Sequence, residues 1–165
     1  MRISLKDIIE ISGAFLPFSF EVDTSGLEFE GVRGFSSPVT ASGEIRNHAG
    51  ALCVTGEIRG EMDCVCARCL KEFRRELHIP IEAYLAEELQ DEELEDTYLL
   101  DGDYADLGEI ATTALVLNMD QRFLCSEDCK GLCPKCGKNL NDGPCDCRED
   151  QDPRLAVLAQ LLEKD

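Results

Sequence analysis

The sequence predicts an α+β protein, in which an N-terminal antiparallel, barrel-like β-sheet is followed by helices and a C-terminal cysteine-rich module. Three observations support this fold class. Apolar and polar residues alternate between residues 14 and 85, helical spacing follows residue 106, and cysteines gather in close pairs. We expect a β domain over residues 1–86, an acidic connector over 87–106, and a unit over 107–165 with a helix, the cysteine block and a terminal helix.

The β domain is predicted from period-two alternation, which is typical of half-buried strands. The alternating stretches span residues 18–22, 39–45, 52–62 and 77–83. Residues 47–50 (Asn-His-Ala-Gly) supply a turn between the second and third stretches. Gly56 and Gly60 lie on the apolar face of the third stretch, which favours strong bending or close packing, as in a barrel. Residues 4–9 fit one or two helical turns or a strand.

Residues 87–106 carry ten acidic side chains and no basic one, so we expect a solvated connector there. An acidic surface that docks a basic partner is the alternative interpretation. Asp106 and Glu109 then form a capping box, and the apolar spacing of residues 110–118 predicts a helix. A final helix is predicted to begin at Asp152, with leucines along one face.

Composition disfavours several classes of function. The chain has a net charge of −18, from 34 acidic and 16 basic residues, which argues against a large non-specific nucleic-acid footprint. No apolar stretch is long enough to span a membrane, and charged residues interrupt the N-terminal apolar positions that a secretory signal needs. We therefore expect a cytoplasmic protein, whose ten cysteines, in a reducing compartment, indicate metal or redox chemistry.

Eight of the ten cysteines form close pairs, which favours zinc because two thiolates two residues apart can occupy one edge of its tetrahedron. Residues 133–137 (Cys-Pro-Lys-Cys-Gly) have the form of a zinc knuckle. The predicted first zinc site consists of Cys133, Cys136, Cys145 and Cys147. A second candidate site, which would tie the sheet to the C-terminal module, consists of Cys66, Cys69, Cys125 and Cys129. Four thiolates close the coordination sphere, so one or two such ions would be structural.

Other interpretations of the cysteines stay open. An iron–sulfur cluster also takes four thiolates, and a lone Cys-x-x-Cys pair can act as a thiol–disulfide centre. Cys53 and Cys64 lie outside the pairs and are expected to be small buried side chains, although Cys64 could take the place of Cys66. No phosphate-binding loop or nucleophile elbow is present, so no catalytic residue is predicted. The most basic stretch, a candidate contact for RNA or an acidic partner, contains Arg68, Lys71, Arg74 and Arg75.

Two motifs carry a resemblance to a known family. They are Cys-Ala-Arg-Cys-Leu at residues 66–70 and Cys-Lys-Gly-Leu-Cys-Pro-Lys-Cys-Gly-Lys-Asn-Leu-Asn at residues 129–141. With these motifs the chain resembles the YceD family of large ribosomal RNA subunit accumulation proteins. The resemblance implies a non-enzymatic ribosome-biogenesis factor that supports 23S rRNA synthesis, processing or stability.

The strong negative charge makes basic ribosomal proteins or assembly factors the expected partners, with precursor 23S rRNA as a further candidate. We expect no membrane and no small-molecule substrate among the partners. Two alternatives to this function are a zinc-ribbon transcription-type regulator and a thiol oxidoreductase that uses a Cys-x-x-Cys pair.

Overall fold

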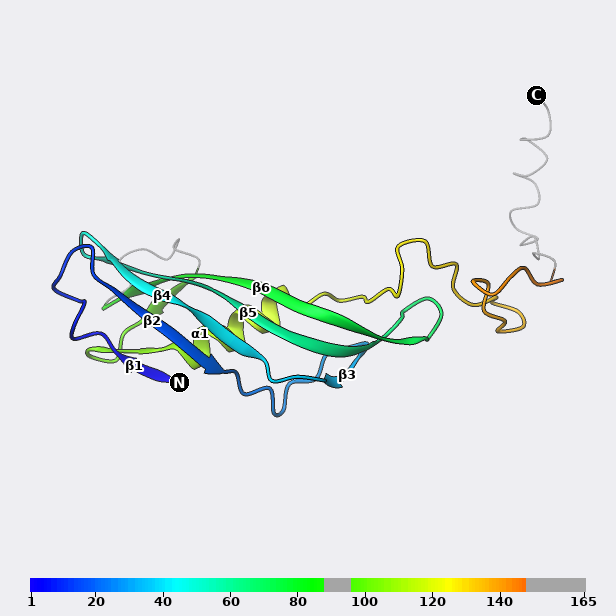
Figure 1. Ribbon diagram of the computed structural model, residues 1–165, viewed down its shortest axis with the longest axis horizontal. Helices are drawn as coiled ribbons and strands as arrows, with labels where there is room; N and C mark the ends of the chain where they lie inside the picture. Colours follow the sequence, from blue (N-terminus) through cyan, green and yellow to red (C-terminus); the bar gives the residue numbers. More distant parts are fainter. Residues whose placement is uncertain (88–95, 148–165) are drawn as a thin grey trace, which may run out of the picture.

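The computed structural model describes residues 1–87 and 96–147, which form a curved β-sheet, one helix and a cysteine-rich extension (Figure 1). In chain order the elements are β1 (Arg2–Ser4), β2 (Phe15–Glu21), β3 (Val32–Phe35), β4 (Thr40–His48), β5 (Ala51–Val65), β6 (Glu72–Ala86), β7 (Thr97–Leu99), β8 (Tyr104–Asp106) and α1 (Leu107–Asn118). The terminal helix predicted from Asp152 lies outside the described residues. Within those residues, no helix is long and apolar enough to cross a membrane.

The main sheet has six strands, in the order β2-β4-β5-β6-β7, and β3 pairs with the C-terminal part of β5. Neighbouring strands are antiparallel except β6 and β7, which run parallel. The four strands predicted from alternation are confirmed as β2, β4, β5 and β6. Because β5 and β6 each have 15 residues, their hairpin extends for about 50 Å and carries its turn far from the opposite end of the sheet.

The strands β4 and β5 approach each other closely at Gly43 and Gly56, which are paired across the two strands. A Cβ atom on Gly43 would lie 2.1 Å from the carbonyl oxygen of Thr55, so no side chain fits at this position. The close packing predicted for Gly56 is therefore present.

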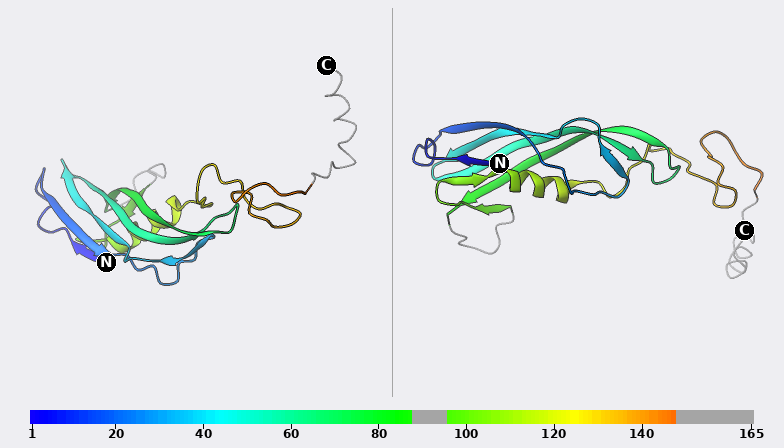
Figure 2. Two further views of the ribbon diagram at one scale, coloured as in Figure 1. Left: turned by 45° about the vertical axis from the view of Figure 1, so that its right-hand side comes forward. Right: turned by 90° about the horizontal axis from the view of Figure 1, so that it is seen from below.

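The predicted barrel-like closure is wrong, because the sheet is open. β2 and β7 remain separate edges of the sheet, and α1 lies across one of its faces (Figure 2). A sheet must bury its apolar face against another element or against itself. Here the helix covers that face, so closure into a barrel is not needed to exclude water.

The main core lies between the sheet and α1. Its members, each at most 4 % exposed, include Ile45, Val54, Ile58, Ile79 and Leu115. Asn47 is the one buried polar residue in the described part of the chain. Its side-chain nitrogen donates hydrogen bonds to the carbonyl oxygens of Ile8 (2.9 Å) and Ile9 (2.8 Å), while its oxygen accepts one from the amide of Gly50 (2.8 Å). Asn47 thus ties the N-terminal segment to the turn between β4 and β5.

The segment predicted as an acidic connector contains two strands in its described part. β7 extends the main sheet beside β6, and β8 pairs with β1. Asp106 then caps α1, since its carboxylate accepts hydrogen bonds from the amides of Gly108 (2.9 Å) and Glu109 (3.2 Å). The capped helix predicted here is confirmed, while the division of the chain into three segments stays a prediction.

Candidate metal centre

The turn between β5 and β6 presents Cys66 and Cys69 at the tip of the long hairpin. The amide of Leu70 donates to the carbonyl oxygen of Cys66 (2.9 Å) and closes a tight turn around the two sulfurs. The same hydrogen bond, from Gly137 to Cys133 (2.9 Å), closes the first turn of the C-terminal extension. In both turns the closing residue has a positive φ, 60° at Leu70 and 73° at Gly137. Residues 66–70 and 133–137 therefore share one turn geometry, and a role of residues 133–137 as a zinc knuckle stays a prediction.

The chain after α1 runs back to the hairpin tip and delivers the next pair of cysteines (Figure 1). Phe123, which is 1 % exposed, anchors this run in the core, and its carbonyl oxygen accepts a hydrogen bond from the amide of Ala67 (2.8 Å). The Arg68 guanidinium donates to the carbonyl oxygens of Glu127 (3.1 Å) and Cys129 (2.9 Å). These contacts fix the loop that ends at Cys129 beside the hairpin turn.

Four sulfur atoms meet where this loop reaches the turn, and we name as cluster A the residues Cys66, Cys69, Cys125 and Cys129. Their Sγ atoms all lie within 4.8 Å of one another, with 3.7 Å between Cys66 and Cys129 and 3.6 Å between Cys69 and Cys125. Zinc binds thiolate sulfur at about 2.3 Å, so the sulfurs of a regular tetrahedron lie about 3.8 Å apart. The sulfur positions of cluster A therefore fit a tetrahedral zinc ion.

Backbone amides stabilise negative charge in cluster A. Burial raises the pKa of the Cys66 thiol, but hydrogen bonds from the amides of Cys125, Cys69 and Arg68 outweigh burial and lower it to about 6. The neighbouring Cys69 is the main cause that raises the pKa of Cys125 to about 12. Ionisation is thus favoured at Cys66 and disfavoured at Cys125, where the contact with the neighbouring Cys69 sulfur opposes it. A divalent cation bound between the sulfurs would favour the thiolate form of all four.

Cluster B consists of Cys133, Cys136, Cys145 and Cys147, whose Sγ atoms also lie within 4.8 Å of one another. It lies beyond the hairpin tip, in the extension that ends the described chain (Figure 2). The amide of Cys133 donates to the carbonyl oxygen of Lys138 (2.8 Å), whose ammonium group donates to that of Pro144 (2.7 Å). Amides of the knuckle, first that of Cys136, lower the pKa of Cys133 to about 6, whereas the Cys136 thiol is the main cause that raises the pKa of Cys147 to about 12. Cluster B repeats the electrostatics of cluster A.

Asn141 connects the two clusters. It lies in the loop between the two cysteine pairs of cluster B, yet its side-chain nitrogen donates a hydrogen bond to Sγ of Cys129 in cluster A (3.3 Å). Its side-chain oxygen accepts from the amide of Lys130 (2.8 Å), and its own amide donates to the Asn139 side chain (3.0 Å). The hydrogen bond from Asn141 is the main cause that lowers the pKa of Cys129. The sequence does not predict this contact, because residue spacing does not show which sulfur a loop amide reaches.

Comparison with known proteins adds the family. The family model described as "Large ribosomal RNA subunit accumulation protein YceD" matches residues 54–162, a range that includes all eight cysteines of clusters A and B. The chain belongs to the YceD family. An uncharacterized protein of Mycobacterium tuberculosis is 31 % identical over 113 residues, which are 66 % of this chain and 55 % of that protein. The chain thus spans about half the length of the mycobacterial relatives that it matches.

Two further relatives support the YceD assignment. The uncharacterized protein YlbN of Bacillus subtilis is 29 % identical over 132 residues, which are 78 % of this chain and 77 % of that protein. An Arabidopsis thaliana protein named "Large ribosomal RNA subunit accumulation protein YCED homolog 1, chloroplastic" is 48 % identical over 42 residues, 25 % of this chain and 13 % of that protein. No solved structure matches the chain significantly. The family takes its description from the accumulation of large-subunit ribosomal RNA.

The basic stretch predicted as a partner contact lies on and beside the hairpin turn of this YceD protein. All four of its side chains are exposed: Arg68, Lys71, Arg74 and Arg75. Arg68 also fixes the loop of cluster A, as described above, while Arg74 pairs with Asp63 (3.2 Å) and Arg75 with Asp120 (2.7 Å). The three arginines therefore have contacts within the chain, and their role in binding a partner stays a prediction.

The two cysteines outside the pairs lie outside both clusters. Cys64 is fully buried in the main core and Cys53 is half-buried. In the described residues it is Cys66, not Cys64, whose sulfur joins cluster A. Cys64 lies within β5 and its side chain is part of the main core, whereas Cys66 follows the end of β5 and begins the turn.

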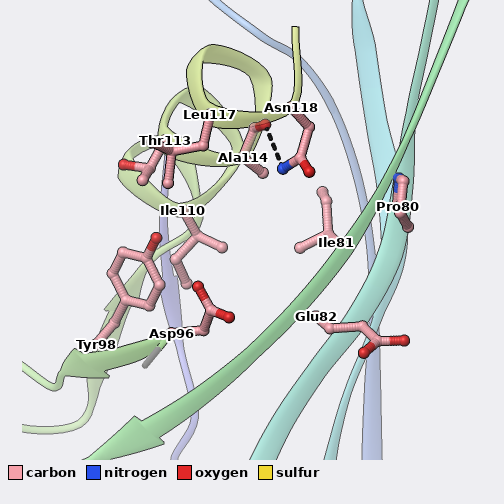
Figure 3. Close-up of a pocket in the computed structure, with 10 residues that line it drawn as sticks. All are labelled: Pro80, Ile81, Glu82, Asp96, Tyr98, Ile110, Thr113, Ala114, Leu117 and Asn118. Atoms are coloured by element: carbon pink, nitrogen blue, oxygen red, sulfur yellow. Dashed lines mark hydrogen bonds between the residues drawn. The ribbon is translucent and has the colours of Figure 1, made fainter. Parts of the chain in front are cut away.

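A separate pocket of about 180 Å³ lies between α1, β6 and β7 (Figure 3). Ile81 and Ile110 face each other across it, Asp96 points towards them, and the Glu82 carboxylate points away. Among the residues that line this pocket, no acid and base are paired for proton transfer. The pocket is the solvent-facing rim of the apolar contact between α1 and the sheet.

Proposed function

We propose that this YceD-family protein is a non-enzymatic ribosome-biogenesis factor that supports 23S rRNA synthesis, processing or stability by binding ribosomal proteins or precursor rRNA. In this proposal clusters A and B each hold one structural zinc ion, which keeps the binding module folded. The main support is a single observation: the family match spans two four-sulfur groups whose spacing suits tetrahedral zinc.

The donor sets suit a structural ion. Four thiolates leave no open position for water or substrate, so a zinc ion there supplies cross-linking rather than Lewis-acid chemistry. Residues 119–147 contain no helix or strand longer than an isolated bridge. Such a segment has little apolar surface to bury, and metal binding is the usual source of folding free energy in small modules of this kind.

The charge of the chain supports protein partners over direct binding to RNA phosphates. The net charge is −18, and a zinc ion with four thiolates adds a net charge of about −2 at each cluster. Binding to RNA requires clustered cations that neutralise phosphates. Basic ribosomal proteins and basic assembly factors complement this surface.

Metal content tests the first part of the proposal. Native mass spectrometry of anaerobically purified protein should show two zinc ions per chain. Cys66→Ser and Cys133→Ser should each retain one, because each removes one ligand of one cluster, and the control Cys53→Ser should retain two. Metal-free, folded wild-type protein, or iron in place of zinc, would contradict the assignment.

Ribosomal RNA levels test the second part. Depletion of the protein should lower mature 23S rRNA relative to 16S rRNA, and wild type or Cys53→Ser should restore the ratio, whereas Cys66→Ser should not. An unchanged ratio in depleted cells would refute the proposed function. Rapid alkylation of Cys66 or Cys69 in zinc-loaded protein would favour a thiol oxidoreductase instead, because bound thiolates are shielded.

A further inference from the structure

An open groove lies beside cluster A at the hairpin tip. It has a volume of about 970 Å³ and is bounded by residues 28–31, the hairpin turn, and residues 116–123. Three apolar side chains that line it are exposed: Leu70 (64 %), Val116 (46 %) and Leu117 (72 %). Apolar side chains that share one concave surface and face water are typical of interaction sites.

Leu70 is in an unusual conformation for its residue type. Its φ of 60° lies in the left-handed region, which glycine adopts freely and a leucine adopts only with strain. The corresponding position of the cluster B knuckle is Gly137, with a φ of 73°. Glycine would close the turn of cluster A equally well. A strained leucine whose side chain is mostly exposed contributes little to folding, so its presence indicates a role outside the fold.

Acidic side chains outnumber basic ones around the groove. Glu28, Glu30, Asp120 and the cation Arg122 line it, and Asp120 is ion-paired with Arg75. Within the described residues, neither Glu28 nor Glu30 forms an ion pair, so both carboxylates are available to a partner. These two unpaired carboxylates attract lysine and arginine side chains.

We propose that this groove binds a basic segment of a partner protein, in which apolar side chains lie between lysines or arginines. The apolar side chains pack against Leu70, Val116 and Leu117, and the cations lie near Glu28 and Glu30. Cys66 of cluster A also lines the groove, so the turn that carries two of the cluster A cysteines forms one of its walls. The inference rests on the proposed function, because it names the kind of partner and the surface through which that function operates.

Fluorescence anisotropy on the zinc-loaded, full-length protein tests the occupant. The probes are a labelled peptide of alternating lysine and leucine, the same peptide with serine in place of leucine, and a single-stranded RNA oligonucleotide. We expect the leucine peptide to bind at least about tenfold more tightly than the serine peptide, a difference of about 1.4 kcal/mol. Equal affinity for the two peptides, or tighter binding of the RNA, would overturn the proposal.

Two variants test the surface. Leu70→Asn keeps the turn, because asparagine tolerates a positive φ, and Leu117→Ser removes an apolar side chain that is already exposed. Neither should lower the melting temperature, and both should weaken binding of the leucine peptide about tenfold. The matched control is Leu99→Ser, since Leu99 is 55 % exposed on β7, away from the groove. Wild-type affinity in both groove variants would overturn the proposal, as would a lower melting temperature of Leu70→Asn with unchanged affinity.

The cellular assay separates failure of the groove from failure of the function. If depletion lowers 23S rRNA and the Leu70→Asn Leu117→Ser double variant restores it fully, the groove is not the docking surface while the function stands. If depletion leaves 23S rRNA unchanged, the function fails whatever the peptide affinities. Restoration by Leu99→Ser but not by the double variant supports both.

Discussion

Replacement of Asn141 by alanine should loosen the metal in cluster A, although Asn141 belongs to the loop of cluster B. The change removes the side-chain hydrogen bond that Cys129 Sγ accepts from Asn141 at 3.3 Å. A hydrogen bond to a charged group contributes about 1.5–3 kcal/mol, and loss of such a contact to a metal ligand typically costs 10–100-fold in metal affinity. Because Asn141 is exposed to solvent, we expect the lower end of this range. Cluster A should bind zinc about tenfold more weakly and release it correspondingly faster.

The aspartate variant sharpens this prediction. Asn141→Asp retains the oxygen that accepts a hydrogen bond from the amide of Lys130, but it replaces the donor with a negative charge beside a thiolate. Like charges at this distance repel each other, so cluster A should lose more affinity for zinc in Asn141→Asp than in Asn141→Ala. A purely conformational role for Asn141 gives the opposite order, because aspartate preserves the loop contact and alanine does not.

Competition with a chromophoric chelator measures the release of zinc from each cluster. Cys145→Ser removes a ligand of cluster B and keeps cluster A, so its remaining kinetic phase identifies release from cluster A. Zinc binding to cluster A should also be weaker in this variant, because coupling between two binding sites is reciprocal. Asn118→Ala is the matched control, since Asn118 is an exposed asparagine whose side chain donates one hydrogen bond, to Ala114, away from both clusters. Equal release of zinc from cluster A in wild type, Asn141→Ala and Asn141→Asp would refute the coupling.

Four further predictions concern the metal and the fold. Chelation should abolish partner binding and the ordered structure of the extension, seen as lost amide protection in hydrogen exchange, and unchanged exchange would contradict a structural ion. Gly43→Ala should lower the free energy of unfolding in urea by about 3 kcal/mol, because the added Cβ would lie 2.1 Å from a backbone oxygen; Gly34→Ala, with nothing within 4 Å, is the control. Asn47→Leu should lower the free energy of unfolding by about 2–3 kcal/mol, because it leaves buried backbone groups without hydrogen-bond partners. A change near zero would show that water replaces the side chain. Asp106→Ala should lower the free energy of unfolding by about 1 kcal/mol, because it removes a helix cap. Burial raises the pKa of Asp106, but the amide of Glu109 and the N-terminal ammonium lower it overall. The stabilisation by Asp106 is therefore present above about pH 4 and is lost as pH falls through the lowered pKa, so a difference between wild type and variant that persists at pH 2 would contradict the cap.

The strands and the grouping of the cysteines could be predicted because each depends on local spacing. Alternation places every second residue of β4, β5 and β6 on one face, and two cysteines two residues apart can meet only at a turn. The grouping of Cys66 and Cys69 with Cys125 and Cys129 followed because these pairs remained once the C-terminal pairs had been matched. Whether both groups bind zinc stays a prediction.

Other features depend on contacts that spacing does not encode. β7 and β8 lie in a run of acidic residues whose charge hides short strands paired with distant partners, Tyr84 in β6 and Ile3 in β1. The open sheet results from the position of α1 across one face, which the sequence of the strands does not contain. The strain at Leu70 and the reach of Asn141 to Cys129 require the three-dimensional path of the chain.

Cluster A also changes the connectivity of the chain. Cys66 and Cys129 lie 63 positions apart, and the intervening stretch includes β6, β7, β8 and α1. An ion held by both residues closes this stretch into a ring, which by loop-closure entropy removes about 4 kcal/mol of freedom from the denatured chain. Metal loss would therefore destabilise the docking of α1 on the sheet as well as the cysteine-rich tip, so the availability of zinc in the cell would set the lifetime of the whole molecule.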